Sequence, residues 1–335
     1  MLRFPYNCEN IFLISVCLLA TSPAWAFRVG LVLDKGGKDD KSFNSSAYEG
    51  ATRAQKDLGI ELKYVEATDT NAIEGLHRAF ASKGFDLIIG IGFAQGDAVK
   101  KIAAQFPDRK FALVDGEVNA PNVRSLLFEE HEGSYLVGAI AAAKANNKTG
   151  AKIGFVGGMD IPLIRRFEMG YEAGAKRVNP QIQVVSNFIG ITSEAWNNTA
   201  KAKELALAQY NSGVDVIFVA AGASGAGVFD AAEESKKLAI GVDSNQNWIK
   251  PGFILTSMLK RVDIAVYNVI KETKEAHFTA GSVHYGLKDK GVDYAIDQYN
   301  DKVLDPATRK KADDLKAQII AGKIQVPDYY KKGKK

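Results

Sequence analysis

Short apolar runs alternate with longer segments of helical spacing along most of the chain. In the first half, the Ile-, Leu- and Val-rich runs that predict buried strands are residues 28–33, 62–66, 87–91 and 111–114. The segments between them that place apolar side chains at helical spacing are residues 45–58, 72–82 and 94–106. This alternation predicts a parallel sheet with helices on both faces.

The same pattern then starts again. The second set of predicted strands is 152–156, 184–188, 216–219 and 239–242, with helices predicted at 162–178, 194–210 and 225–238. GFDLII at 84–89 matches GVDVIF at 213–218, and FALVD at 111–115 matches AIGVD at 239–243. We therefore predict two similar α/β lobes that face each other, with a ligand crevice beyond the carboxyl ends of their strands.

The first 26 residues predict a secretory signal peptide. Arg3 precedes an apolar run of about 10 residues, too short to span a membrane, and residues 24–26 read AWA, a small-x-small cleavage pattern. We expect cleavage after Ala26 and a periplasmic or secreted product. Neither Cys8 nor Cys17 follows a small residue, so a lipoprotein signal is not expected.

Composition narrows the classes of function. Both cysteines lie in the predicted signal, so the rest of the chain can hold no disulfide and no thiolate metal site. The formal charge is +4, with Lys and Arg dispersed among Asp and Glu, which argues against nucleic acid as a partner. The four histidines are scattered, and no Gly-x-Ser-x-Gly elbow is present. We expect no enzyme, no metal and no cofactor.

The loop after the first strand, residues 34–44, is rich in Gly and charge but lacks the spacing of a phosphate loop. We predict that Ser42 caps the following helix. Phe43 then lies in the first helical turn, where it either offers a ring face to a ligand or packs as a hydrophobic staple. Asn44 either binds the ligand or is solvated.

Other candidates also follow strands. Asp115 and Asp243 occupy matching places in the two lobes; each could be a turn former, but the pairing favours ligand binding. Gly222 opens a Gly-rich loop that lets the backbone approach a ligand. Trp196 is either core or a second ring face, and Lys260 either donates to ligand hydroxyls or is solvated.

Several ordered motifs together resemble the basic membrane protein (PnrA-like) family of ABC-transporter substrate-binding proteins, from residue 27 to about 294. The motifs are DDKSFN at 39–44, FALVD at 111–115, RFEMGYEAG at 166–174, IGVDSNQ at 240–246 and SMLK at 257–260. Two features depart from the family: its members are often lipoproteins, and Asn245 stands where the family often has Asp.

The resemblance implies capture of nucleosides, chiefly purine nucleosides, for an ABC permease in the inner membrane. It implies roles for these residues: Phe43 and Trp196 stack on the base, Asp40 and Asn44 bind near it, Asp115 binds polar groups, Asp243 and Lys260 hold the ribose, and Gly222 gives backbone contacts. We expect a monomer.

The resemblance also implies the type I periplasmic-binding-protein fold, two doubly wound parallel-sheet lobes joined by a three-crossover hinge. We expect crossings near Glu129, Thr256 and Tyr285. Lobe 1 is then 27–129 plus 257–285, lobe 2 is 130–256 plus 286–330, and 331–335 is a basic tail. A helix over about 306–321 should close over one lobe. The alternatives that remain are a sugar- or furanose-binding protein of this fold, a surface receptor or adhesin, and, more remotely, an enzyme.

Overall fold

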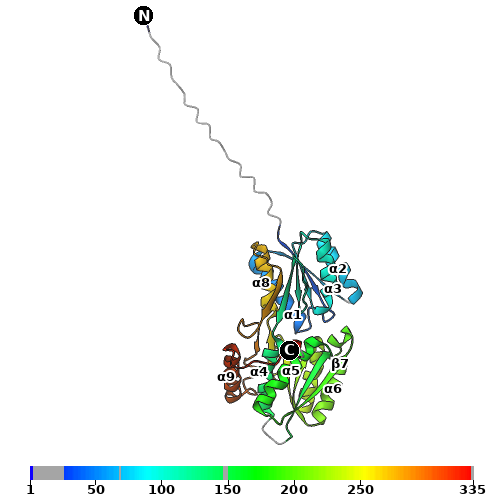
Figure 1. Cartoon of the computed structure of the whole chain (residues 1–335), viewed down its shortest axis with the longest axis vertical. Coiled ribbons are helices and arrows are strands. Elements are labelled where there is room, and N and C mark those ends of the chain that lie inside the picture. Colours follow the sequence, from blue (N-terminus) through cyan, green and yellow to red (C-terminus); the bar gives the residue numbers. More distant parts are fainter. Residues whose placement is uncertain (3–25, 68, 146–149, 333–335) are drawn as a thin grey trace.

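The computed structural model describes residues 1–2, 26–67, 69–145 and 150–332. Nearly all of the predicted signal peptide, and residues 333–335 of the predicted basic tail, lie outside these ranges. The described chain forms two lobes that lie one above the other along the long axis of the molecule (Figure 1).

The first lobe is built on a six-stranded sheet in the order β2-β1-β3-β4-β5-β11, with every neighbouring pair parallel. Its strands are β1 (Arg28–Leu33), β2 (Glu61–Glu66), β3 (Leu87–Ile91), β4 (Lys110–Val114), β5 (Val123–Phe128) and β11 (Gly281–Tyr285). Its helices are α1 (Phe43–Leu58), α2 (Ile73–Ser82), α3 (Gly96–Gln105) and α8 (Val262–Lys274). Leu31 packs with the residues of α1, whereas its neighbour Val32 packs with those of α2 and α3. Successive strand residues thus face opposite helical layers, as a doubly wound sheet requires.

The second lobe repeats this plan in the order β7-β6-β8-β9-β10-β12, in which only the β10–β12 pair is antiparallel. Its strands are β6 (Lys152–Met159), β7 (Gln183–Gly190), β8 (Val214–Ala220), β9 (Leu238–Asp243), β10 (Ile254–Lys260) and β12 (Val292–Tyr294). Its helices are α4 (Glu130–Lys144), α5 (Pro162–Val178), α6 (Thr199–Asn211), α7 (Gly225–Ser235) and α9 (Pro306–Ile320). The predicted fold class and its internal repeat are confirmed.

Two glycine-bearing helices form the centre of the second lobe. A Cβ atom at Gly138 of α4 would lie 2.0 Å from the backbone oxygen of Tyr171 in α5. A Cβ at Gly174 of α5 would in turn lie 1.9 Å from the backbone oxygen of Tyr135. The glycines of the RFEMGYEAG motif therefore serve close helix packing, and α9 covers the outer side of α4 (Figure 1).

Three connections cross between the lobes: β5 to α4, β10 to α8 and β11 to β12. Because β10 pairs within the second sheet as far as Lys260, we move the proposed second crossing from Thr256 to about residue 260 and keep the other lobe limits as proposed. In each sheet the strand order reverses beside the first strand, between β1 and β3 and between β6 and β8. Ligands of such sheets bind outside the carboxyl ends of the strands at this point.

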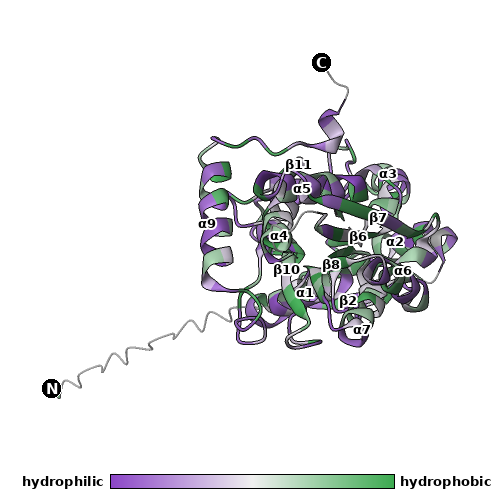
Figure 2. Cartoon of the chain, turned by 90° about the horizontal axis from the view of Figure 1, so that it is seen from below, coloured by the Kyte–Doolittle hydropathy of each residue, from purple (hydrophilic) through white to green (hydrophobic). Residues whose placement is uncertain are grey.

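Hydrophobic positions gather on the strands inside each lobe, and hydrophilic positions colour the outer faces of helices such as α9 (Figure 2). None of the helices in the described ranges combines the length and the apolar character that a membrane span requires.

Candidate ligand-binding site

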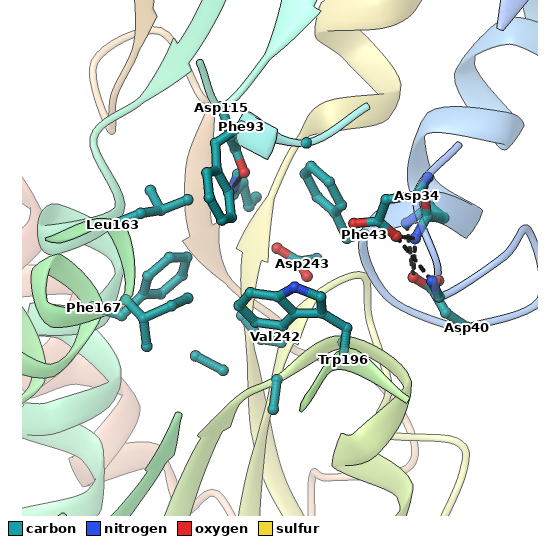
Figure 3. A pocket seen from close by; sticks show the side chains of 18 residues that line it. Asp34, Asp40, Phe43, Phe93, Asp115, Leu163, Phe167, Trp196, Val242 and Asp243 are labelled. Carbon is teal, nitrogen blue, oxygen red and sulfur yellow. Dashed lines mark hydrogen bonds and ion pairs between the residues drawn. The ribbon is translucent and has the colours of Figure 1, made fainter. Parts of the chain in front are cut away.

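A cavity with an empty volume of about 560 Å³ lies between the lobes, beyond the carboxyl ends of their strands (Figure 3). The structure brings all eight predicted site residues to its wall: Asp40, Phe43, Asn44, Asp115, Trp196, Gly222, Asp243 and Lys260. The first four come from the first lobe and the last four from the second.

The loop after β1 is organised by Asp40. Its Oδ1 accepts hydrogen bonds from the backbone N–H groups of Ser42 at 2.8 Å and Ser45 at 3.0 Å, and its Oδ2 accepts from that of Asn44 at 2.9 Å. Ser42 occupies the N-cap position of α1 as predicted, but its side chain makes no capping hydrogen bond, because the Asp40 carboxylate serves several N–H groups that one hydroxyl cannot reach together. Ser42 Oγ instead donates across the cleft to Asp243 Oδ2 at 2.7 Å.

Asn44 is engaged by the same loop. Its Nδ2 donates to Asp34 Oδ1 at 2.6 Å and to Asp40 Oδ2 at 2.9 Å, while its Oδ1 accepts from the backbone N–H of Asp34 at 3.0 Å. Two of these bonds, one to the carboxyl and one from the backbone N–H of Asp34, hold Asp34 in place at the cavity wall, and the third joins Asn44 to Asp40. Asn44 thus positions another residue as well as lining the cavity.

Asp34 is a cavity residue that the sequence reasoning missed. Burial raises its pKa from 3.8 to about 6, against the hydrogen bonds from Asn44 and Gly36 that lower it. No donor among the described residues reaches its second oxygen, Oδ2. A Cβ at Gly92, whose φ is +109°, would lie 3.3 Å from that oxygen. Asp34 follows β1 and Gly92 follows β3, so the strand-order rule would have pointed to both.

Aromatic rings enter the cavity from both lobes. Phe43, in the first turn of α1, comes from one lobe, and Trp196 comes from the other (Figure 3). Trp196 lies in a short 3₁₀ turn, Ser193–Trp196, ahead of α6, not at the start of one long helix as predicted. Its indole rests on Gly158 of β6, where a Cβ would lie 2.1 Å from ring atom Cζ3. Two further rings in the wall, Phe93 and Phe167, were not predicted.

The two matching aspartates share an unusual backbone. Asp115 and Asp243 have φ values of +65° and +64°, in the left-handed region that few residues other than Gly adopt. Both line the same cavity, so the twin lobes turn their matching strand ends toward one space. Gly222, at φ +56°, starts a 3₁₀ turn after β8 and exposes backbone at the opposite wall.

Lys260 joins these carboxyls. Its side chain is 2% exposed, and its Nζ donates to Asp115 Oδ2 and lies 3.6 Å from Glu130 Oε1. The same ammonium lies 4.9 Å from the ring centroid of Phe43. Burial lowers the pKa of Lys260, but the carboxylates of Asp115, Glu130 and Asp243 outweigh it and raise the pKa above its ordinary value.

The carboxyl oxygens retain capacity to accept hydrogen bonds. Asp115 Oδ1 is buried and has no hydrogen-bond partner among the described residues. Burial raises the pKa of Asp243 to about 6, although Lys260 and the bond from Ser42 lower it. The cavity therefore offers ring faces, several carboxyl acceptors and one cationic donor. That set suits a ring with hydroxyl and N–H groups and disfavours an anion.

A buried ionic network backs the cavity at the hinge. Arg166 Nη1 donates to Glu130 Oε2 at 2.7 Å, and its Nε donates to Asp328 Oδ1 at 2.8 Å. Burial raises the pKa of Glu130 to about 7, against the charges of Lys260 and Arg166. Glu129, His131 and Asp328 lie close enough to share a metal ion. Arg166 already donates to both of those carboxylates, however, so this cluster is explained by an arginine.

In both sequence and structure, this chain is similar to known ligand-binding proteins of ABC transporters. Residues 27–329 match the family described as ABC transporter substrate-binding protein PnrA-like. The Lactococcus lactis "ABC transporter nucleoside-binding protein BmpA" is 37% identical over 323 residues, covering 90% of this chain and 89% of that protein. "Basic membrane protein A" of Borreliella burgdorferi is 34% identical over 309 residues, covering 90% and 87%. The crystal structure of ABC transporter system solute-binding proteins from Aeropyrum pernix has a TM-score of 0.81 at 30% identity, covering 90% of this chain and 94% of that one.

Proposed function

This chain belongs to the PnrA-like family of ABC transporter substrate-binding proteins, and from that premise we propose that it captures nucleosides, purine nucleosides above all. Proteins of this family act outside the cytoplasm, bind small ligands and work with a membrane permease. The observation that carries the proposal is one cavity between the lobes that combines aromatic rings from both lobes with a cluster of carboxyls around a buried ammonium.

The aromatic part of the cavity suits a base. Phe43 and Trp196 come from different lobes, so closure brings both ring faces toward a planar ligand. Each stacked base contributes ~1–3 kcal/mol in comparable sites. Asp34, fixed by Asn44, can accept the N1–H of a 6-oxopurine at the edge of the base. A pentose alone would leave these rings without a planar partner.

The charged part of the cavity suits a ribose. Asp243 and Asp115 can each accept from a sugar hydroxyl, and Lys260 can donate to one. Hydrogen bonds to charged groups contribute ~1.5–3 kcal/mol each. Several carboxyls close together repel a phosphate, which favours nucleosides over nucleotides.

The remaining parts of the proposal concern the cycle of the protein. We infer that the leader is cleaved after Ala26 and that the product acts as a monomer in the periplasm or outside the cell. Ligand binding then shifts an equilibrium between open and closed lobes, and the closed form docks on the permease.

The direct test is mass spectrometry of the ligand released from natively purified protein, followed by calorimetric titration with inosine, guanosine, adenosine and ribose. We expect a purine nucleoside to co-purify and at least one of the three to bind. Ribose binding as tightly as every nucleoside would favour a sugar-binding protein instead. Absence of any co-purified nucleoside together with no measurable nucleoside binding would contradict the proposal.

A further inference from the structure

A second cavity, which we call the outer cavity, adjoins the ligand cavity at the mouth of the cleft. It has an empty volume of about 430 Å³ and shares Asp34, Gly92, Phe93 and Trp196 with the ligand cavity. The loops after β1 and β7 border it, and these strands lie away from the hinge edges β11 and β12. The two cavities thus adjoin at these four residues.

The residues that the two cavities share decide which end of a ligand faces outward. Asp115, Asp243 and Lys260 line the ligand cavity and not the outer cavity, whereas Asp34 and Trp196 line both. In the proposed function, the first three hold the ribose and the last two contact the base. The edge of the base beside Asp34 then faces the outer cavity, an orientation that rests on the proposed function.

Two polar side chains of the outer cavity, Gln95 and Lys35, are already engaged. Gln95 Nε2 donates to the backbone oxygens of Val32 at 3.0 Å and Ile91 at 2.8 Å, and its Oε1 lies 2.7 Å from His77 Nε2. Lys35, on the outer rim, forms an ion pair with Glu194 of the other lobe. A polar substituent would therefore find few free partners here.

Apart from Asp34 and Ser193, the rest of the wall is apolar. Ala67, Ile73 and Ile91 contribute aliphatic groups, and Phe93 and Trp196 contribute rings. Ile73 and Ile91 are buried, so this wall is held by the core of the first lobe. An apolar group placed here would gain roughly 25 cal/mol for each Å² of apolar surface removed from water.

We propose that the outer cavity is a subsite for an apolar substituent on the base, so that the protein accepts purine nucleosides carrying alkyl or aryl groups at the C6 position. The substituent passes between Asp34 and Trp196 and lies against Ile73. The protein should therefore tolerate substituents at the C6 edge of the base. It should discriminate between ligands at the ribose end, which charged groups enclose.

The test compares parent nucleosides with derivatives by calorimetry. Inosine, guanosine and adenosine are the parents, and N6-methyladenosine and N6-benzyladenosine, which keep an exocyclic N–H that Asp34 can accept, are the probes. We expect both probes to bind within about thirtyfold of adenosine, a difference of ~2 kcal/mol. Probes that bind more weakly than this, beside a parent that binds, would overturn the subsite and leave the proposed function standing. Failure of all three parents would overturn the function itself.

Variants locate the substituent. Ala94 and Ser193 line the outer cavity from opposite lobes, and Ala94 is exposed, so a larger side chain there should be tolerated by the fold. Ala94→Trp, and independently Ser193→Trp, should weaken the N6-benzyl probe at least about tenfold while adenosine changes less than about threefold. Ala104→Trp, at an exposed position of α3 that lines neither cavity, is the matched control. An unchanged affinity for the N6-benzyl probe in both folded cavity variants would refute the location.

Discussion

Replacing Asp243 by Asn should separate the stability of this protein from its affinity. The side chain is buried, its Oδ2 accepts from Ser42, and its backbone has φ +64°. Asn keeps the shape of the side chain and tolerates a left-handed backbone, whereas Ala would add strain there. Asp243→Asn therefore tests the carboxylate charge alone, and Asp243→Ala serves as a harsher second variant.

The pKa of Asp243 gives the expected change in stability. Burial raises it from 3.8 to about 6, so the folded protein holds the proton more tightly than the unfolded chain does. The resulting cost is absent below pH 3.8, grows as the pH rises through 6 and reaches ~3 kcal/mol at pH 7. Asp243→Asn removes this cost, so the variant should melt at the same or a higher temperature than the wild type. The difference should be larger at pH 8 than at pH 5.

Affinity should change in the opposite direction. If the carboxylate accepts a ribose hydroxyl, its loss removes about 3 kcal/mol of charge-assisted hydrogen bonding, which is roughly a hundredfold in Kd. The assays are scanning calorimetry at pH 5 and pH 8 and titration with the nucleoside that binds the wild type most tightly.

Asp39→Asn is the control, because its carboxylate is 85% exposed and lies one residue from Asp40. It should leave the affinity unchanged. Two results would refute the reasoning. One is a Kd within threefold of the wild type in both Asp243 variants. The other is a melting temperature of Asp243→Asn that, measured relative to the wild type, is lower at pH 8 than at pH 5.

Three further predictions follow from the same structure. Trp196→Phe should keep most of the nucleoside affinity, whereas Trp196→Ala should weaken that affinity about 10–100-fold in titrations. Trp248 is 48% exposed, so Trp248→Ala is the control. Because the pKa of Asp34 is about 6, its carboxylate protonates as the pH falls, so inosine affinity should drop about tenfold between pH 7 and pH 5. Asp34→Asn should bind inosine more weakly at pH 7 and flatten that profile in titrations; an equally steep profile would assign the effect elsewhere. Arg166→Met removes the buried cation that Glu129, Glu130 and Asp328 share and should cost ~3–5 kcal/mol in chemical denaturation. Arg165→Met, at a more exposed pair, should cost ~0–1 kcal/mol.

The repeat in the sequence explains why much of the site could be predicted. Asp115 and Asp243 follow equivalent strands, and a doubly wound sheet gathers strand ends at one edge, so their meeting at one cavity needs no knowledge of side-chain contacts. The same rule would have pointed to Asp34, which directly follows β1. What the sequence could not show is how its carboxyl is held, because the hydrogen bonds between Asn44 and Asp34 form only in the folded loop.

Helix α4, which follows the first crossing, was missed for a different reason. Twelve of the 15 residues of α4 are buried, so this helix has little exposed face and its sequence lacks the apolar–polar period that identifies a surface helix. Its first residue, Glu130, is buried only because Lys260 and Arg166, distant in sequence, converge on it. Pairing of this kind depends on tertiary structure and leaves no local pattern.

The carboxyls of the cleft also suggest why closure should depend on a ligand. Burial raises the pKa values of Asp34 and Asp243, and Asp115 Oδ1 has no hydrogen-bond partner among the described residues. Groups of this kind are costly to remove from water unless a donor meets them. In the proposed complex, ribose hydroxyls and a base N–H supply those donors, so the ligand offsets a cost that closing the lobes imposes. The closed form is then populated mainly with ligand bound, because the ligand's differential affinity for that form shifts the equilibrium. A permease that recognises the closed form would thereby distinguish loaded from unloaded protein without contacting the nucleoside.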